Sequence, residues 1–493
     1  MKRLMRVRIE HLWAILPIAL LAWFSLLRRV GLLDFWWHLK AGQIIVTTGS
    51  IPRADLFSFT CPGRQFILQN WLVEVIYWGA YRVGGLAMVV TLNSAMLVAA
   101  FVPVYLLCRQ AARGPRAAAI VACIAVGALL TFSNVRSQVF SFACFSATYW
   151  VLSAYRARRQ NALWVLPLLM VAWVNLHGGF VLGLGLMALF LGSEAVRRLV
   201  LGPGPDTLAP SEIAGLGAAL ALSLVATLVN PEGWRAYSSV TAVTRDPVSQ
   251  SFVTEWQPPR FDQVGVLGFY GPFFAALLVF LYARERLDLT ELALFIGFAV
   301  FALTALRNAI WFVLVVTPIV ARHVRTIRVP EHRAAAPVRY GLNTVLALVL
   351  VAVTVALLPW FRAGGDRSLV DDETPVGAID YMETHGLRGN VFAPEIYGDY
   401  LIWRLWPAQR SFVDSRVHLF NQCPAVVDDY NLVFFDSHWE ERLARYRIRY
   451  MLLSKDEVES RSMIDGGRAS ARWRVLYEDG SSILFENTRE ASA

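Results

Sequence analysis

Long apolar runs separated by short polar segments occupy the chain up to about residue 361. Most runs reach the length that a helix needs to cross a bilayer core ~30 Å thick. Spanning segments must be helical, because lipid offers no partner for open backbone groups. The pattern therefore predicts an α-helical polytopic membrane protein with about eleven spans. The spans are expected to start near Leu12, Leu86, Ala117, Val139, Ala162, Phe180, Ile213, Val266, Glu291, Ala309 and Leu342.

Two of the polar segments are much longer than the others, and both are expected to lie outside. The first covers residues 28–85 and holds two stretches of helical periodicity, Phe35–Val46 and Trp71–Val83. Because these stretches carry polar faces, we expect helices that lie along the membrane interface. The second covers residues 230–265. The fifth and sixth spans are expected to form a hairpin that turns at His177–Gly179.

From about residue 362 the pattern changes to short strand-like runs that alternate with helical ones. Expected strands are Asn390–Ala393, Arg410–Asp414, Tyr450–Leu453, Trp473–Tyr477 and Ser482–Phe485, and expected helices are Pro375–His385, Ile396–Trp406 and Trp439–Tyr446. This alternation favours a small α/β domain. We therefore divide the chain into a transmembrane domain, residues 1–361, and an extracytoplasmic α/β domain, residues 362–493. An alanine-rich linker lies at Ala334–Pro337.

The composition supports the membrane interpretation. Hydrophobic residues make up 56% of the chain, charged residues 17%, and the mean hydropathy is +0.47. A soluble protein with so little charge could not cover its surface. Because the first apolar run is not followed by a small-residue cleavage site, it is expected to be an anchor and not a signal peptide.

The net charge of +9 does not indicate nucleic-acid binding, because the basic residues cluster in every second loop. That is the positive-inside pattern. It predicts that the chain lies in the inner membrane with its N-terminus in the cytoplasm. An odd number of spans then carries the C-terminal domain to the outer side. The clusters are Lys2, Arg3, Arg6 and Arg8; Arg109, Arg113 and Arg116; Arg156, Arg158 and Arg159; Arg197 and Arg198; Arg284 and Arg286; and Arg322, Arg325, Arg328, Arg333 and Arg339.

The five cysteines say little about function. Cys108, Cys123 and Cys144 fall in predicted spans or at their ends and are expected to pack as small hydrophobic residues. Cys61 and Cys423 both lie on the predicted outer side and could pair there. Nothing in their spacing supports a bond, so we expect the two thiols to be separate.

Unexplained polar residues gather on the predicted outer side: Asp34, His38, Lys40, Asp55, Glu74, Arg136, His177, Glu255 and Arg307. Ionisable groups at the ends of spans on one face commonly converge on a cavity. Asp34 is the strongest candidate for a general base, because it lies where a lipid-linked donor would meet its acceptor. Its alternative role is to cap the helix that starts at Phe35.

The polar residues that follow Asp34 in the first outer loop each have more than one possible role. His38 shares a helix face with Asp34 and would orient the carboxylate or contact a phosphate, or it is an ordinary interfacial histidine. Lys40 points elsewhere on the helix and is kept as a candidate substrate contact. Asp55 is either a second acid or the first residue of an Asx turn after Pro52.

Arg136 and Arg307 lie in short outer loops, where the positive-inside tendency opposes arginine. Each guanidinium is expected to bind a substrate phosphate, or else to pair with an acid such as Glu74 or Glu255 or with a lipid headgroup.

The remaining candidates are less specific. His177 lies at the apex of a hairpin, beside two glycines that permit the close approach of a ligand. Glu255 precedes Trp256, whose ring suits stacking on a sugar face. No cysteine, histidine or carboxylate motif has metal-ligand spacing, although Asp34, Asp55 or His177 could still hold a divalent ion such as Mg²⁺ or Mn²⁺. Asp414 ends an expected strand, and its pairing with Arg416 is favoured over a ligand contact.

Three segments of this chain resemble a group of poorly characterised bacterial members of the GT-C superfamily of integral-membrane glycosyltransferases. They are Asp-Phe-Trp-Trp-His-Leu-Lys-Ala-Gly from Asp34, Ser-Ile-Pro-Arg-Ala-Asp-Leu-Phe-Ser-Phe-Thr from Ser50, and Trp-Val-Asn-Leu-His-Gly-Gly from Trp173. In the superfamily, an acid early in the first outer loop serves as the catalytic base, and this chain has Asp34 there. Many members carry a second acid directly beside the first, and this chain does not.

The resemblance implies inverting transfer of a hexose or pentose from a polyprenyl-phosphate donor to an extracytoplasmic glycan, lipid or protein. Asp34 would deprotonate the acceptor hydroxyl, while Arg136 and Arg307 would stabilise the phosphate leaving group. Two alternatives remain open. A transporter or flippase would carry ionisable residues in mid-span and symmetric halves. A non-catalytic envelope scaffold would have a plugged site beside Asp34.

Overall fold

The computed structural model describes residues 7–32, 34–112, 114–246, 250, 254–327, 340–435 and 438–489. The chain forms two compact units. Unit 1 comprises residues 1–28, 87–240 and 250–363, and unit 2 comprises residues 29–86, 241–249 and 364–493. Several residues of the basic clusters and the alanine-rich linker lie outside the described residues: Lys2, Arg3, Arg6, Arg113, Arg328, Arg333, Arg339 and Ala334–Pro337.

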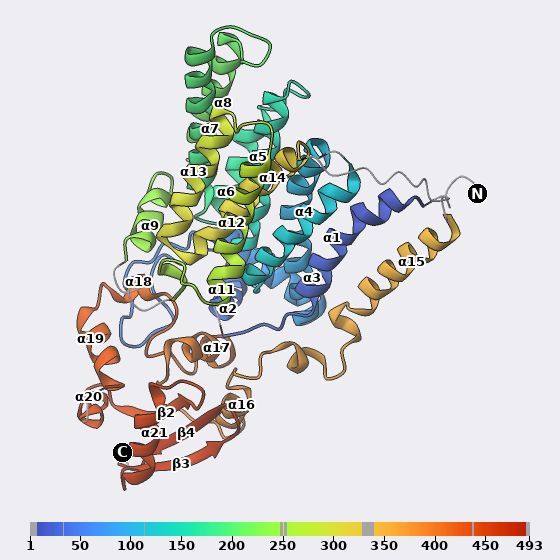
Figure 1. The fold of residues 1–493 in the computed structure, drawn as a ribbon. Coiled ribbons are helices and arrows are strands. Elements are labelled where there is room, and N and C mark those ends of the chain that lie inside the picture. The colour runs from blue at the N-terminus through green and yellow to red at the C-terminus, as the bar shows by residue number, and fades with distance from the viewer. Residues whose placement is uncertain are drawn as a thin grey trace. The chain divides into compact units, whose positions relative to one another are not determined.

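Unit 1 is a bundle of apolar helices (Figure 1). Its helices are α1 (Ile9–Leu26), α4 (Pro115–Leu129), α5 (Gln138–Arg156), α6 (Val165–Leu176), α7 (Phe180–Leu201), α8 (Pro210–Ala226), α11 (Gln263–Gly265), α12 (Gly271–Tyr282), α13 (Leu289–Thr304), α14 (Ala309–Val324), α15 (Tyr340–Ala356) and the second part of α3 (Trp71–Ala111). Helix α9 (Arg235–Thr244) lies in the second outer loop. Within the bundle α13 packs on α14, α1 on α4, and α6 on α8.

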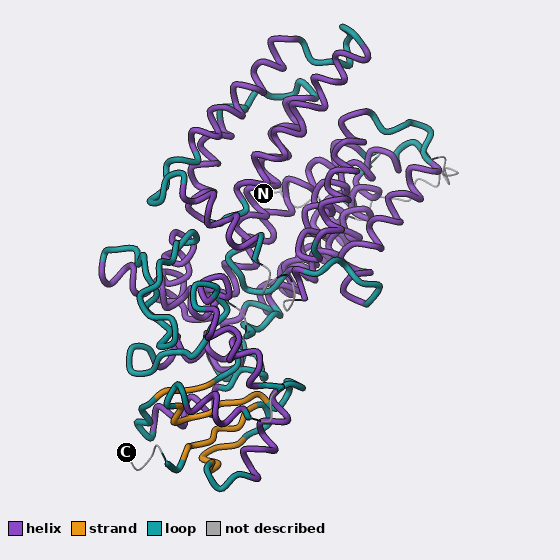
Figure 2. Tube along the Cα trace, turned by 90° about the vertical axis from the view of Figure 1, so that its left-hand side faces the viewer, coloured by secondary structure: helices purple, strands orange, loops and turns teal. Residues whose placement is uncertain are grey.

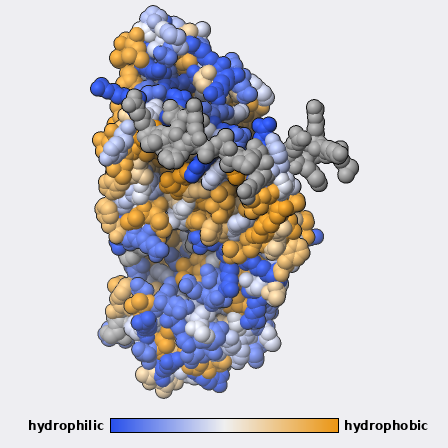
Figure 3. Space-filling model, turned by 45° about the vertical axis from the view of Figure 1, so that its right-hand side comes forward, coloured by the Kyte–Doolittle hydropathy of each residue, from blue (hydrophilic) through white to orange (hydrophobic). Residues whose placement is uncertain are grey.

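A helix occurs at each of the predicted span positions. Among the described residues, five helical segments are both long and apolar enough to cross a membrane: α1, α3, Pro115–Phe132, α7 and Gln263–Tyr282. Helices α6, α8, α13 and α15 are apolar but shorter. The number of helices that cross the membrane stays a prediction. Large apolar side chains such as Leu199, Leu281 and Leu348 are exposed, and hydrophobic areas are broad in Figure 3, as contact with lipid requires.

Helix α3 is two helices joined at a kink. The backbone leaves the helical region at Gly84 and Gly85, and Gly85 has a φ of 60°, which glycine adopts without strain. Residues as far as Leu86 belong to unit 2, and those from Ala87 belong to unit 1. The predicted boundary between the helix Trp71–Val83 and the span from Leu86 is therefore confirmed.

Unit 2 contains a four-stranded sheet with the order β1-β2-β4-β3 (Figure 2). The strands are β1 (Asn390–Phe392), β2 (Ile448–Ser454), β3 (Trp473–Glu478) and β4 (Ser482–Asn487). Strand β1 is parallel to β2, and the other two pairs are antiparallel. The helices of the unit are α2 (Phe35–Thr48), α16 (Val376–Thr384), α17 (Glu395–Leu405), α18 (Val417–Phe420), α19 (Pro424–Val433), α20 (Trp439–Ala444) and α21 (Ser460–Ala469).

The first outer loop and the C-terminal segment share one hydrophobic core. Trp37 and Ile44 of α2 belong to the same buried cluster as Met451 of β2 and Phe485 of β4. The apolar face of α2 is therefore covered by protein, and the expected place of this helix along the membrane interface stays a prediction.

Two expectations about unit 2, one strand and the state of two cysteines, were wrong. Segment Arg410–Asp414 is not a strand of the sheet, because Ser411 exchanges backbone hydrogen bonds with Phe57 and Phe59 of the outer loop. Cys61 and Cys423 form a disulfide, with their Cα atoms 6.1 Å apart. Sequence spacing could not reveal this bond, because folding of unit 2 brings together two residues that are 362 positions apart.

Candidate functional site

Asp34 stands at the start of α2 with its carboxylate partly exposed. Its backbone is already helical, with φ −51° and ψ −14°, and its carbonyl accepts a hydrogen bond from His38 N at 3.2 Å. Among the described residues, its carboxylate makes no capping hydrogen bond to the first turn. The helix-cap role is therefore not realised. The Asp34 side chain is 25% exposed, whereas the His38 side chain is 2% exposed.

His38 lies between two carboxylates. Its Nδ1 is 2.9 Å from Glu74 Oε1, and its Nε2 is 3.8 Å from Asp34 Oδ2. Burial lowers the pKa of His38, but the hydrogen bonds and charges of Asp34 and Glu74 outweigh burial and raise it to about 9. At neutral pH the imidazole is therefore positively charged and lies beside Asp34. The predicted role of His38 in orienting Asp34 fits this geometry.

Lys40 points away from Asp34, as its place in the helix predicts. Its Nζ lies 5.0 Å from the centre of the Trp403 ring, in a cation–π contact. Burial lowers the pKa of Lys40. This contact joins α2 to α17, which supports a structural role.

The carboxylate of Asp55 has a structural role. It accepts hydrogen bonds from Phe57 N at 3.0 Å and from Ser58 N at 3.1 Å, which is the expected Asx turn. Its Oδ1 also lies 2.7 Å from Arg416 Nη2, and Arg416 pairs with Asp414 at 2.7 Å. The predicted pairing of Asp414 with Arg416 is confirmed. One buried arginine thus joins the outer loop to the C-terminal segment.

Asp399 is a buried carboxyl of unit 2 within the run Tyr397–Trp403, for which the sequence predicted no role. Its Oδ1 accepts a hydrogen bond from Ser415 N at 3.1 Å, and its Oδ2 has no hydrogen-bond partner among the described residues. Burial, and then the charge of Asp414, raise the pKa of Asp399 well above its usual range. The preceding Gly398 was the available signal, because a side chain there would collide with the carbonyl of Val413.

The other predicted residues lie in unit 1 and form a second group. Arg136 Nη1 lies 2.6 Å from Glu255 Oε2, and Arg307 Nη1 lies 3.6 Å from Glu255 Oε1. The Arg307 guanidinium also lies 4.2 Å from the centre of the Trp256 ring. The backbone holds this arrangement, because Leu306 N donates to Gln257 O at 2.8 Å. Two arginines and one glutamate leave the group with one net positive charge.

His177 ends α6, as the predicted hairpin requires. Its Nδ1 accepts a hydrogen bond from Gly179 N at 2.9 Å and lies 2.9 Å from Ser141 Oγ. Trp173 Nε1 donates to the same hydroxyl at 2.7 Å. A side chain at Gly179 would collide with Ser141, so the glycine permits this turn. These contacts hold the His177 ring at the turn.

A divalent ion at Asp34, Asp55 or His177 stays a prediction. In the described part of the chain, no group of three or more histidines, cysteines or carboxylates could hold a metal. Asp55 is engaged by Arg416 and by its own turn.

Comparisons with known proteins give likenesses of fold. No family model matches the sequence, and no curated protein matches it. The solved structures that resemble the chain include the following three. The Archaeoglobus fulgidus oligosaccharyltransferase is 15% identical with a TM-score of 0.50, and the match covers 90% of this chain and 69% of that one. ArnT from Cupriavidus metallidurans in the apo state is 13% identical with a TM-score of 0.53, over 97% and 98%.

The third structure is the mycobacterial arabinofuranosyltransferase AftD. It is 12% identical with a TM-score of 0.53, and the match covers 97% of this chain and 41% of that chain. At these identities the likeness concerns the fold. The predicted class, a helical polytopic membrane protein with a small C-terminal α/β part, is confirmed.

Proposed function

Because the chain has the fold of the GT-C superfamily, we propose that it is a membrane glycosyltransferase. It moves a hexose or pentose from a polyprenyl-phosphate donor to an extracytoplasmic glycan, lipid or protein acceptor, with inversion at the anomeric carbon. The observation that carries the proposal is the state of Asp34. Its carboxylate is partly exposed at the start of α2 and lies 3.8 Å from the buried imidazole of His38.

Asp34 acts as the general base. Its carboxylate takes the proton from the acceptor hydroxyl, and the oxygen attacks the anomeric carbon of the sugar. The bond between that carbon and the phosphate oxygen breaks, and polyprenyl phosphate leaves with the electron pair. The ion pair between His38 and Glu74, at 2.9 Å, fixes the imidazole and so limits the motion of its neighbour Asp34.

Arg136 and Arg307 bind the phosphate of the donor. Their net positive charge, shared with Glu255, supports this role, as does the planar fork that guanidinium offers to phosphate oxygens. Trp256 stacks on Arg307 and holds its guanidinium plane. His177 stays a proposed substrate contact.

The chain lies in the inner membrane, with its N-terminus in the cytoplasm and unit 2 on the outer side. The alternation of basic clusters supports this orientation. The disulfide Cys61–Cys423 supports it independently, because such bonds persist in oxidising compartments and are rare in the cytosol.

Release of polyprenyl phosphate tests the proposal without knowledge of the acceptor. The purified full chain in lipid nanodiscs is offered polyprenyl-phosphate hexoses and pentoses with an extract of envelope components, and the released lipid phosphate is quantified. Asp34→Asn should lower the rate by about 100-fold or more, since general-base catalysis contributes 10²–10⁴-fold. In the same assay Arg307→Gln should weaken donor binding.

The matched control is Asp372→Asn, which changes an aspartate of unit 2 whose side chain is 89% exposed. This variant should keep the wild-type rate. Full turnover by Asp34→Asn would exclude Asp34 as the base. A wild-type chain that binds the lipid phosphate but turns over no donor would favour the envelope scaffold.

A further inference from the structure

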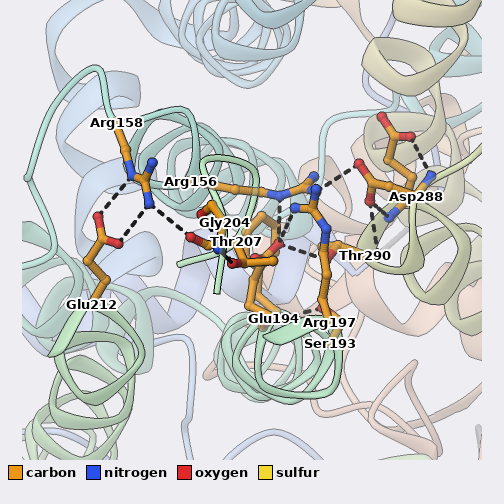
Figure 4. A network of polar contacts seen from close by, with 12 residues as sticks. Arg156, Arg158, Ser193, Glu194, Arg197, Gly204, Thr207, Glu212, Asp288 and Thr290 are labelled. Carbon is orange, nitrogen blue, oxygen red and sulfur yellow. Dashed lines mark hydrogen bonds and ion pairs between the residues drawn. The ribbon is translucent and has the colours of Figure 1, made fainter. Parts of the chain in front are cut away.

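Arginines that join the helices of unit 1 are paired with acids. In the network of Figure 4, Arg156 lies 2.6 Å from Glu194 and 2.7 Å from Asp288, and so connects α5, α7 and the residue before α13. These arginines are explained by the fold. Unit 2 contains arginines of another kind, which are exposed and have no acid within ion-pair distance among the described residues. Three of them lie at one edge of the sheet: Arg388, Arg447 and Arg489.

The topology of the sheet brings these three arginines together. Strands β1 and β2 are parallel and begin at the same edge, where Asn390 pairs with Ile448, and β4 is antiparallel to β2 and ends there. Arg388 stands two residues before β1, Arg447 directly before β2, and Arg489 two residues after β4. The strands are neighbours in the order β1-β2-β4 and so lie about 4.8 Å apart. The three side chains therefore form a row across adjacent strands, which we call the arginine row.

The acids near the arginine row are bound by other arginines. Glu486 lies 2.6 Å from Arg474 and 3.5 Å from Arg449, so two arginines share one carboxylate. Counted by sequence, the segments that carry the row and its neighbours hold eight arginines and five acids: Arg388, Arg442, Arg445, Arg447, Arg449, Arg472, Arg474 and Arg489, with Asp429, Glu440, Glu441, Glu486 and Glu490. This part of unit 2 therefore keeps a net positive charge, and the unpaired share of it lies on exposed side chains.

The turn before β2 does not explain the arginine at position 447. The backbone of Arg447 is in the left-handed region, with a φ of 51°. That conformation costs free energy for most residues with a Cβ atom, whereas glycine and asparagine adopt it more readily. Like charges on adjacent strands also repel each other. Both the backbone and the charge of Arg447 are therefore unfavourable locally, and a bound anion would offset the repulsion.

The arrangement of the arginine row favours an extended anion. Guanidinium groups offer paired N–H donors to carboxylate and phosphate oxygens. A linear molecule that carries a charge on successive units can contact successive arginines along the row. Protein partners and membranes add contacts to large apolar side chains, but residues 386–390, 445–449 and 487–489 include no exposed tryptophan, phenylalanine or leucine.

We propose that the arginine row binds a polyanionic glycan, an extended sugar polymer that carries carboxylates or phosphates. The polymer is bound on the outer side of the membrane, where unit 2 is predicted to lie. The proposal depends on that orientation and is independent of sugar transfer, because the three arginines are not part of the proposed catalytic machinery.

Fluorescence anisotropy tests the proposal by binding alone. The full chain in phosphatidylcholine nanodiscs is titrated into labelled oligogalacturonate, labelled phosphomannan oligomers and labelled neutral dextran, and dissociation constants are measured at several salt concentrations. The two anionic oligomers should bind, more weakly as salt screens the charges, and dextran should not. The combined variant Arg388→Gln, Arg447→Asn and Arg489→Gln should weaken binding about tenfold or more, at roughly two- to fivefold for each exposed charge.

The matched control removes the same number of charges elsewhere in unit 2. Arg64→Gln, Arg367→Gln and Arg461→Gln change three exposed arginines outside the segments of this edge, and the combined control should keep the wild-type dissociation constants. Folding is checked by the melting temperature, which Arg447→Asn should not lower, because asparagine adopts the left-handed conformation more readily. Should the combined row variant fail to fold, Arg447→Asn alone decides through its own two- to fivefold loss, an estimate for about one exposed charge.

The outcomes also identify the anion. Binding of oligogalacturonate alone assigns a carboxylate polymer, binding of phosphomannan alone assigns a phosphate polymer, and either supports the proposal if the row variant weakens it. Equal losses in the row variant and the control would mean that only the net charge matters, and this would overturn the proposal, as would failure of both anionic oligomers to bind. Row-dependent flotation with phosphatidylglycerol vesicles, without binding of either oligomer, would assign the row to a lipid surface instead.

Discussion

Removal of the His38 imidazole should change how the stability of unit 2 depends on pH. The pKa of His38 is about 9 in the folded chain, against 6.5 for an unperturbed histidine. The folded state therefore holds the proton more tightly than the unfolded state. The resulting stabilisation is fully present below about pH 6.5 and is lost as the pH rises through 9. At 1.36 kcal/mol per pKa unit, the shift corresponds to about 3 kcal/mol.

The assay is thermal unfolding in detergent, followed by tryptophan fluorescence from pH 6 to pH 10. Wild-type protein should lose about 3 kcal/mol of unfolding free energy that His38→Gln does not lose. His385→Gln, which changes an exposed histidine, should keep the wild-type slope. Equal slopes for wild type and His38→Gln would refute the conclusion that His38 is protonated between Asp34 and Glu74.

Two further predictions concern the joints of unit 2. Cys61→Ser or Cys423→Ser should lower the unfolding free energy by about 2–5 kcal/mol, because the disulfide is lost. Non-reducing peptide mapping should show the Cys61–Cys423 disulfide only in wild type. An unchanged melting temperature of the variants would contradict this prediction. Arg416→Met should cost about 3–5 kcal/mol, because it leaves the carboxylates of Asp55 and Asp414 buried without their cation. Limited proteolysis measures that loss, and resistance equal to wild type would mean that the buried pair is not needed.

The local pattern of apolar residues predicted most of the helices, because each apolar run must satisfy its backbone hydrogen bonds within its own segment. The kink at Gly84 and Gly85 was predictable for the same local reason, since two adjacent glycines interrupt a continuous run. Four of the five expected strands were also found. The exception is Arg410–Asp414, which has a strand-like composition. Its residue Ser411 forms backbone hydrogen bonds with Phe57 and Phe59, and no local sequence pattern indicates that these distant segments pair.

The candidate site was only partly predictable. Asp34 and His38 stand four residues apart, so helical spacing alone placed them together. The partners of Asp55 and Cys61 lie more than three hundred positions away and depend on tertiary packing. No role was predicted for Asp399, because its burial depends on the packing of α17 against α2, which its own neighbours in sequence do not encode.

The disulfide between Cys61 and Cys423 sets the order in which the protein can be completed. Its two sulfurs are separated by 362 residues, which take about 20 to 70 s to translate at usual rates. Throughout that interval Cys61 is a free thiol on a newborn chain, and the helices between the two cysteines are inserted first. Unit 2 is thus finished last, although it contains some of the earliest residues to be synthesised. A chain that stops before Cys423 leaves Cys61 without its disulfide partner.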